Sequence, residues 1–161
     1  MRGMIAAARA GGYGIAMVNT FTLEIARGVL SAAERLRAPI ILGTAEALIP
    51  NTSLADAAAM LIPMARRSGV PAAVHLDHGY TFEVLEEALK LGFTSVMYDR
   101  SCDAYDENVR KTAEMARLAH AYGATIEAEL GHVRFQGEGE EPNRYTDPRD
   151  ARDFVEKTGV D

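Results

Sequence analysis

Short apolar runs and segments with helical periodicity alternate along the whole chain. Within the longer segments apolar residues recur three or four positions apart, as Leu23, Ala26 and Leu30 do, which predicts helices with one buried face. The apolar runs between these segments are too short for helices and predict buried strands. The expected strands cover residues 14–18, 39–44, 71–76, 93–98 and 124–130. The expected helices cover residues 22–37, 53–67, 82–91 and 106–122, with a last helix starting at residue 147.

Glycine marks the predicted C-terminal end of four helices. Gly69, Gly92, Gly123 and Gly159 each follow a helical segment, at a position where a left-handed backbone suits glycine. Strands that are separated by single helices pair in parallel through right-handed crossovers. The chain is therefore expected to be an α/β protein, built either as a doubly wound sheet or as a (βα)-barrel.

Acidic residues at the ends of three successive strands favour the barrel. Asp77, Asp99 and Glu129 each close a predicted strand, and Glu127 shares a strand face with Glu129 because side chains alternate with period two. In a doubly wound sheet helices cover both faces and would bury these glutamates under apolar surface. In a barrel the acids point inward at the C-terminal mouth, where such enzymes keep their chemistry. The alternative is that the acids cap the following helices, which suits Asp99 better than the glutamates.

The composition is that of one globular domain over residues 1–161. Of these residues 48% are hydrophobic and 25% are charged, which is enough apolar material for a packed core. No apolar stretch approaches the length of a membrane span, and a net charge of −6 argues against binding to nucleic acid or to anionic membranes. The single cysteine, Cys102, cannot form an intramolecular disulfide, and no secretory signal opens the sequence, so a cytoplasmic location is expected.

Carboxylates grouped with a histidine predict a divalent metal site, with zinc as the leading choice for a histidine ligand. His78 is the candidate ligand because it ends a strand beside an acid. Its side chain and that of Asp77 diverge within a regular strand, since they are neighbours in sequence. They converge only where the strand breaks, and Gly79 permits such a break.

The other three histidines have different expected roles. His75 points inward from a strand and is expected to be buried and hydrogen-bonded, without contacting the metal. His120 lies on a predicted helix and is expected on the surface. The role of His132, just past the fifth strand, is left open.

The chain resembles the class II (metal-dependent) ketose-bisphosphate aldolases, the fructose- and tagatose-bisphosphate aldolase family. The resemblance rests on VHLDHG at 74–79, on the following TFEVLEEALKLGFTSVMYDRS, and on EAELG at 127–131. The opening AGGYGIAMVNTFTLEIARGVLSAAERLRAPIIL is similar to the family's first strand, first helix and second strand. The resemblance implies a (βα)8 TIM barrel, of which this chain would be the N-terminal portion with about five βα units.

The resemblance also implies a set of metal-binding residues. His78 corresponds to a catalytic zinc ligand of the family. Asp99 and Glu129 correspond to acidic positions that can hold a second divalent ion or a monovalent cation. Zinc acts in this family as a Lewis acid, so that no Schiff-base lysine is needed. Consistently, no lysine stands at a predicted strand end.

Three further roles follow from the same resemblance. Asp77 corresponds to the residue that takes the C4 hydroxyl proton in cleavage and returns it in condensation. Asn19 falls where the family's first strand ends in an asparagine facing the substrate. Glu138, with Glu140 and Glu141 as neighbours, is the nearest match to a loop glutamate that assists proton transfer at the dihydroxyacetone phosphate carbon.

The activity implied is the reversible aldol cleavage of a ketose (bis)phosphate to dihydroxyacetone phosphate and an aldehyde, by a homo-oligomer that is a dimer or a tetramer. Two departures leave the sugar open. Ala45 stands where many relatives have a serine that touches substrate, and Arg134 and Phe135 stand where relatives commonly have a flexible glycine pair.

The family continues past Asp161 into segments that supply two more zinc histidines and the phosphate-binding backbone, so these 161 residues alone are expected to be inactive. Two other functions stay open. One is a non-catalytic truncated half-barrel that serves as an oligomerisation or binding module. The other is a different metal-dependent barrel enzyme, such as an isomerase or a hydrolase, that uses the same acids.

Overall fold

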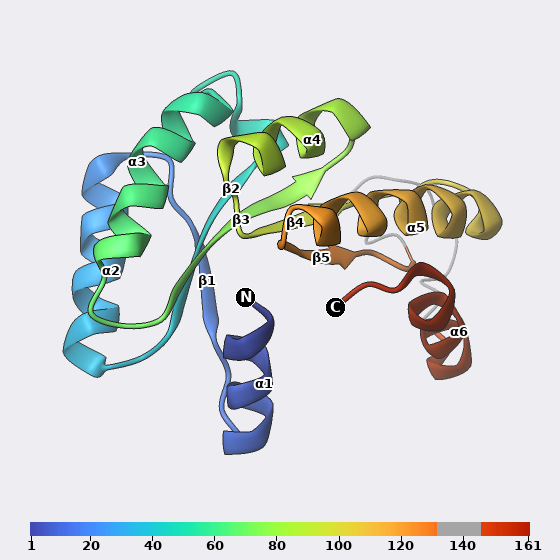
Figure 1. The fold of residues 1–161 in the computed structure, drawn as a ribbon, viewed down its shortest axis with the longest axis horizontal. Coiled ribbons are helices and arrows are strands. Elements are labelled where there is room, and N and C mark those ends of the chain that lie inside the picture. The colour runs from blue at the N-terminus through green and yellow to red at the C-terminus, as the bar shows by residue number, and fades with distance from the viewer. Residues whose placement is uncertain (132–145) are drawn as a thin grey trace, which may run out of the picture.

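The computed structural model describes residues 1–131 and 146–161, in which one helix precedes five strand–helix repeats (Figure 1). The strands are β1 (Ala16–Asn19), β2 (Ile40–Ala45), β3 (Ala72–Gly79), β4 (Ser95–Tyr98) and β5 (Thr125–Ala128). The helices are α1 (Arg2–Gly11), α2 (Leu23–Leu36), α3 (Leu54–Arg67), α4 (Phe82–Leu91), α5 (Tyr105–Ala121) and α6 (Pro148–Thr158). A short 3-10 helix, η1 (Glu46–Leu48), lies between β2 and α3.

The five strands form one parallel sheet whose spatial order, β1-β2-β3-β4-β5, is also their order in the chain. A doubly wound sheet reverses its strand order at a switch point, and this sheet does not. Figure 1 shows α2, α3, α4 and α5 following one another in an arc around the strands. The fold is therefore α/β with about five βα units of a (βα)8 barrel, as the sequence predicts.

Alternate residues of each strand serve two different environments. Val74 and Leu76 on β3 pack with the covering helices in a hydrophobic core that also contains Leu42 and Ile126. The residue between them, His75, lies on the opposite side of the strand. The inner face of the barrel wall is therefore more polar than the outer face, and it can carry chemistry.

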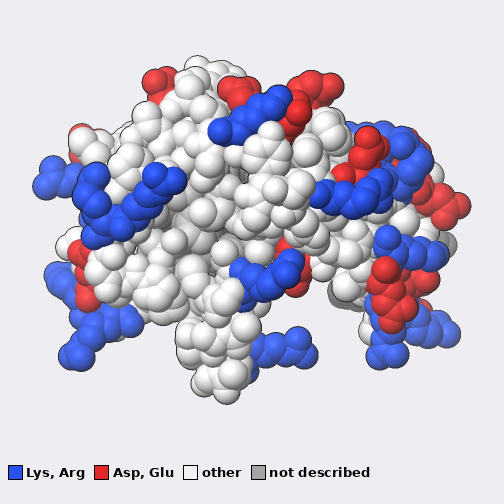
Figure 2. Space-filling view, in the orientation of Figure 1, with Lys and Arg blue, Asp and Glu red and all other residues white. Residues whose placement is uncertain are grey.

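Charged side chains gather on the outer helices. On the face shown in Figure 2, basic and acidic side chains are interspersed over α5 and α6, while the centre of the view is mostly uncharged. Within the part of the chain that the structure describes, no helix is long and apolar enough to cross a membrane.

The local structure departs from the sequence predictions in one added helix and at one helix end. The Ala-rich helix α1 was not predicted, although Gly12 ends it in the left-handed conformation with φ 66°. Gly92, Gly123 and Gly159 have positive φ as predicted, but Gly69 does not. Glu34 instead accepts the Gly69 N–H at 3.0 Å, and this bond holds the connection between α3 and β3 without a glycine cap.

The C-terminal end of β3 is irregular. Its pairing with β4 runs from Leu76 opposite Val96 to Gly79 opposite Tyr98, so β3 advances three residues (76 to 79) while β4 advances two (96 to 98). The extra residue is a bulge, and His78 within it has φ 43°. The predicted break in the strand is present. Gly79 was expected to permit it, but the residue that takes the left-handed conformation is His78.

Gly79 is needed for packing. A Cβ atom at this position would lie 2.4 Å from Leu85 Cδ1, and Leu85 is fully buried on α4. The absence of a side chain at Gly79 therefore lets α4 approach the end of β3.

We expect Gly79→Ala to lower the free energy of unfolding by about 1–3 kcal/mol, because the added methyl group overpacks a closed site. Gly28→Ala is the matched control, since Gly28 is exposed within α2 and its added Cβ meets no atom within 4 Å. That variant should be unchanged or more stable by up to about 1 kcal/mol. Urea titration measures both values. Equal stability of the two variants would contradict this account of Gly79.

Candidate functional site

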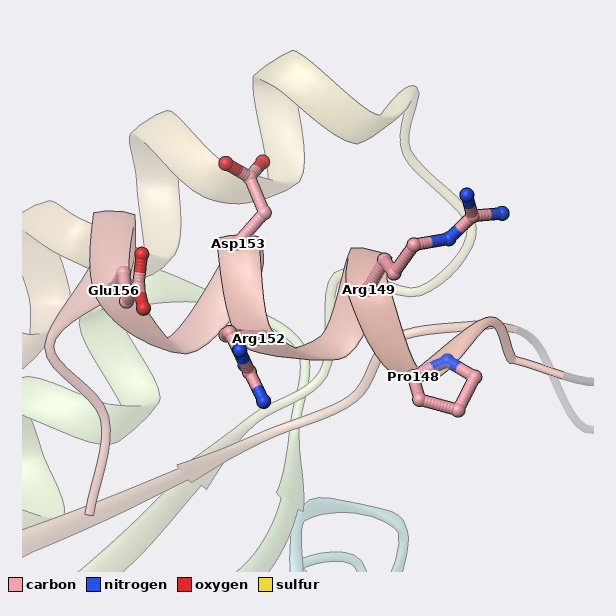
Figure 3. A pocket seen from close by; sticks show the side chains of 5 residues that line it. All are labelled: Pro148, Arg149, Arg152, Asp153 and Glu156. Carbon is pink, nitrogen blue, oxygen red and sulfur yellow. The ribbon is translucent and has the colours of Figure 1, made fainter.

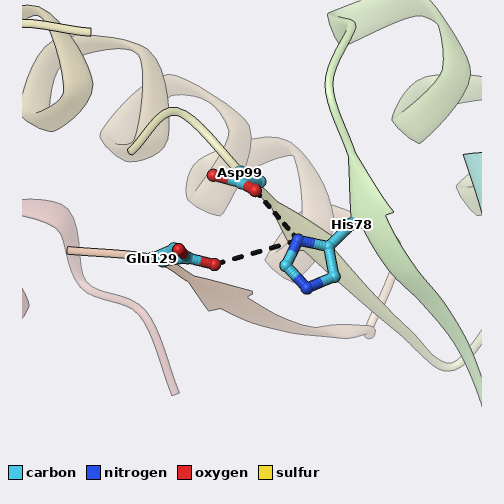
Figure 4. Close-up of side chains that lie close together, drawn as sticks. All are labelled: His78, Asp99 and Glu129. Carbon is cyan, nitrogen blue, oxygen red and sulfur yellow. Dashed lines mark hydrogen bonds and ion pairs between the residues drawn. The ribbon is translucent and has the colours of Figure 1, made fainter. Parts of the chain in front are cut away.

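The C-terminal ends of β3, β4 and β5 bring one histidine and two acids together (Figure 4). His78 Nδ1 lies 2.8 Å from Asp99 Oδ2 and 3.8 Å from Glu129 Oε2. One ligand atom from each of the three residues lies within 4.8 Å of the others. The His78 side chain is 40% exposed, whereas those of Asp99 and Glu129 are 11% and 17% exposed. The imidazole is therefore the most exposed of the three side chains, and the two acids beside it are mostly buried; we call this group the acidic recess.

The charges in this recess reinforce one another. Burial lowers the pKa of His78, but the hydrogen bond to Asp99 and the negative charges of Asp77, Asp99 and Glu129 outweigh it, so the pKa is raised. Burial raises the pKa of Asp99, but hydrogen bonds from Ser101 and His78 outweigh it, so that pKa is lowered. The recess therefore favours positive charge on the imidazole and negative charge on Asp99, which is the field that a cation requires.

The donor set fits a divalent ion. Zinc binds imidazole nitrogen and carboxylate oxygen at about 2.0–2.2 Å, so two ligand atoms in tetrahedral geometry lie roughly 3.3 Å apart. The two observed separations, 2.8 Å and 3.8 Å, lie on either side of that value. Small side-chain movements would therefore place all three residues around one ion, with the proton on His78 Nδ1 released as the ion binds.

Asp77 lies beside this group and is held by a different strand. Asn19 Nδ2, at the end of β1, donates to Asp77 Oδ2 at 2.9 Å. Asp77 Oδ1 is 4.0 Å from His78 Nε2, which is too far for a hydrogen bond. One oxygen of Asp77 is thus fixed by Asn19, and the other faces the space next to His78.

Asn19 has an unused acceptor. Its Oδ1 atom is buried and has no hydrogen-bond partner among the residues that the structure describes. A Cβ atom on Gly43, the β2 residue paired with Asn19, would lie 2.6 Å from this oxygen. The amide therefore occupies space that is open only because residue 43 is a glycine.

His75 sits deeper on the same strand and behaves differently from His78. It is 2% exposed, and its Nδ1 forms a 2.8 Å hydrogen bond with Ser95 Oγ. Burial lowers the pKa of His75 to about 4 despite the neighbouring charge of Asp77. Glu127 Oε2 approaches its Nε2 at 3.7 Å, but a neutral imidazole forms no ion pair. His75 is thus the buried, hydrogen-bonded residue that the sequence predicts.

The remaining candidate residues are either exposed away from this group or lie outside the described residues. His120 is exposed, as predicted, and its Nε2 contacts Asp161 Oδ2 at 3.0 Å near Arg2, away from the recess. Glu138 lies outside the described residues. The same holds for the other residues of that loop on which the sequence was interpreted: His132, Arg134, Phe135, Glu140 and Glu141.

Sequence reasoning missed three residues next to the site. Glu46 and Arg100 both contact the backbone of Tyr80, two residues after His78. The rings of Tyr80 and His78 lie 6.3 Å apart. A charged residue within two positions of a strand end is the signal that could have identified Glu46 and Arg100.

A separate surface depression of about 260 Å³ runs along α6 (Figure 3). Its lining, which comes from this one helix, mixes both signs of charge: Pro148, Arg149, Arg152, Asp153 and Glu156. Asp153 points back toward α5 and accepts a hydrogen bond from the Tyr105 hydroxyl. This depression has no grouped ligand atoms, so the recess around His78 remains the candidate site.

Comparison with known proteins shows the family to which this chain is related. A family model described as "Fructose-bisphosphate aldolase class-II" matches residues 1–161. A fructose-bisphosphate aldolase from Thermus caldophilus is 41% identical over 158 residues, which is 96% of this chain and 52% of that protein. The uncharacterized protein YdjI from Escherichia coli K12 is 39% identical over 152 residues, covering 92% of this chain and 55% of that protein.

Solved structures give the same result. The crystal structure of the YdjI aldolase from Escherichia coli K12 superposes with a TM-score of 0.88 at 35% identity, covering 100% of this chain and 58% of that one. The crystal structure of a putative fructose-1,6-biphosphate aldolase from Coccidioides immitis also has a TM-score of 0.88, at 26% identity. The match covers 99% of this chain and 57% of that one. The chain thus spans about half the length of the relatives that it matches.

The buried state of His75 predicts a pH dependence of stability. Below about pH 6.5 the unfolded chain takes up a proton that folded His75 does not accept until about pH 4, so stability falls as the pH is lowered through this range. The full difference between the two pKa values corresponds to about 3 kcal/mol in the free energy of unfolding. His75→Gln keeps a polar partner for Ser95 and should lack this loss. Urea unfolding of both proteins between pH 7 and pH 4 measures this loss of stability. An NMR titration in which His75 has its ordinary pKa of 6.5 would refute the prediction.

Proposed function

Because this chain belongs to the class II fructose-bisphosphate aldolase family, we propose that the protein containing it catalyses the reversible aldol cleavage of a ketose (bis)phosphate to dihydroxyacetone phosphate and an aldehyde. The observation that carries the proposal is the recess in which His78, Asp99 and Glu129 converge, with Asp77 alongside. An aldolase of this class needs a cation site and a base that reach one substrate, and the end of β3 supplies a residue for each.

The metal is proposed to be zinc, held by His78 with Asp99 or Glu129. A divalent ion bound there supplies Lewis acidity toward the ketone oxygen. The alternative to a metal is a lysine that forms a Schiff base with the ketone, and no lysine of this chain is placed for that role. Lys90, Lys111 and Lys157 lie on the outer helices, where each pairs with an acid.

Asp77 is proposed to move the proton. In cleavage it takes the proton of the C4 hydroxyl, the O–H electron pair forms the aldehyde carbonyl, and the electrons of the C3–C4 bond pass to the ketone half. Asn19 holds one oxygen of Asp77, so the other oxygen is directed at the substrate. We propose that Asn19 also binds substrate by accepting a hydroxyl hydrogen at its unpaired Oδ1.

The remaining roles rest on family membership. Glu138 is proposed to assist proton transfer at the dihydroxyacetone phosphate carbon.

The substrate is proposed only as a phosphorylated ketose, since Ala45, Arg134 and Phe135 differ from common family residues. Among the described residues, His78 is the one histidine in the candidate metal group, and the 161 residues alone are proposed to bind zinc weakly and to be inactive.

We also propose that the protein acts in the cytoplasm as a dimer or tetramer, without nucleic acid or membrane partners. Support for the location is the single cysteine, and support for the absence of polyanionic partners is the net charge of −6. The proposed self-association rests on the family resemblance alone.

Asp77→Asn tests the proposed base. In the full-length protein this change should lower kcat by about 100-fold to 10,000-fold, because the amide cannot accept the hydroxyl proton while the shape of the side chain is kept. Bound zinc and the unfolding midpoint should stay as in the wild type. Steady-state kinetics with fructose 1,6-bisphosphate and other ketose phosphates, together with metal analysis, give both readouts.

Asp150→Asn on the exposed surface of α6 is the matched control and should leave kcat unchanged. A loss of zinc in Asp77→Asn that matches its loss of activity would show that Asp77 serves mainly as a metal ligand. Cleavage that survives complete removal of metal by EDTA would contradict the proposed reaction class.

A further inference from the structure

Both backbone polar groups of Tyr80 are held by side chains from neighbouring βα loops. The Tyr80 N–H donates to Glu46 Oε2 at 2.5 Å, and Glu46 directly follows β2. The Tyr80 carbonyl accepts from Arg100 Nη1 at 2.9 Å, and Arg100 follows β4. The turn that leaves β3 is therefore held from both sides, two residues after His78.

This turn carries a conformational cost. A residue other than glycine in the left-handed region is disfavoured by about 1–2 kcal/mol, and it persists only where its surroundings fix it. His78 is such a residue, with φ 43°. Hydrogen bonds that hold the next residues of the chain are the means by which a protein fixes such a conformation.

Glu46 also supplies the cap of α4. Thr81 is the N-cap residue of this helix, but its side chain makes no capping bond. The Glu46 carboxylate accepts from the Thr81 N–H and hydroxyl, each at 3.4 Å, in addition to the Tyr80 N–H. A negative charge at a helix N-terminus is favourable. Glu46 thus ties the start of α4, the turn and the loop after β2 into one unit.

We propose that Glu46 is a positioning residue for the metal site, which sets the orientation of His78 through the backbone of Tyr80. The proposal rests on the proposed function only in that His78 receives a divalent ion. Arg100 acts from the other side, held by Asp103 at 2.7 and 2.8 Å. Arg100 is next to Asp99 in sequence, so a change there would alter the recess directly. Glu46 is therefore the residue to vary.

The chain contains a matched control at the opposite end of the same strand. Glu34 on α2 accepts the Gly69 N–H at 3.0 Å and the Ser68 hydroxyl at 3.3 Å, just before β3 begins. Like Glu46, it is a glutamate that holds a backbone N–H of a neighbouring loop. A purely structural role predicts similar effects of removing either residue.

The test compares Glu46→Ala, Glu46→Gln and Glu34→Ala in the full-length protein, with Co²⁺ as the probe. Glu46→Ala should weaken Co²⁺ binding by about 10-fold to 100-fold, the range typical for residues that orient a metal ligand, and should change the visible Co²⁺ spectrum. Glu46→Gln should recover most of the affinity, because its amide oxygen still accepts the Tyr80 N–H. Glu34→Ala should match the wild type in both affinity and spectrum.

Wild-type Co²⁺ affinity and spectrum in Glu46→Ala would overturn the proposal and leave Glu46 as a helix cap. A wild-type protein that binds no Co²⁺ would overturn it as well, since His78 would have no ion to receive. A wild-type protein that binds Co²⁺ but cleaves no ketose phosphate would refute the proposed function. In that case the weaker Co²⁺ binding of Glu46→Ala would still support the positioning role.

Discussion

The left-handed conformation of His78 is the constraint on which the rest of the site depends. In a regular strand adjacent side chains point to opposite faces, so Asp77 and His78 could not serve one substrate. The bulge that ends β3 inserts one residue, and His78 takes φ 43° within it. As a result the imidazole meets the acids of β4 and β5 while Asp77 stays bonded to β1. One strained residue thereby connects the chemistry of four strands.

The two histidines of β3 show how position alone divides their roles. They are three residues apart, yet burial lowers the pKa of His75 to about 4, and the surrounding acids raise that of His78. His75 stays neutral within the barrel wall and holds Ser95. His78 meets carboxylates at the open mouth, where a cation can replace its proton. Depth along one strand thus separates a structural histidine from a candidate ligand.

Much of this arrangement could be predicted from sequence. Periodicity predicts the strands and the helices that follow them, and acids at three strand ends predict a shared site, because parallel strands present their C-terminal ends at one edge. The exact geometry of the break was not predictable: Gly79 was expected to permit it, but His78 is the residue with the left-handed backbone, and Gly79 is needed for packing against Leu85. The contact of Glu46 with Tyr80 was not predictable either, because it joins residues 34 positions apart and depends on the register of the sheet. The roles of Asp77 and Asn19 came from family resemblance, not from the pattern.

A divalent ion is proposed to bind between the ends of β3, β4 and β5, with His78 as its imidazole ligand. Anomalous diffraction at the zinc edge, from crystals of the full-length protein grown with zinc, tests it most directly. We expect a peak at about 2.0–2.2 Å from a His78 ring nitrogen and from a carboxylate oxygen of Asp99 or Glu129. A zinc peak outside bonding distance of His78, with none at this recess, would contradict it.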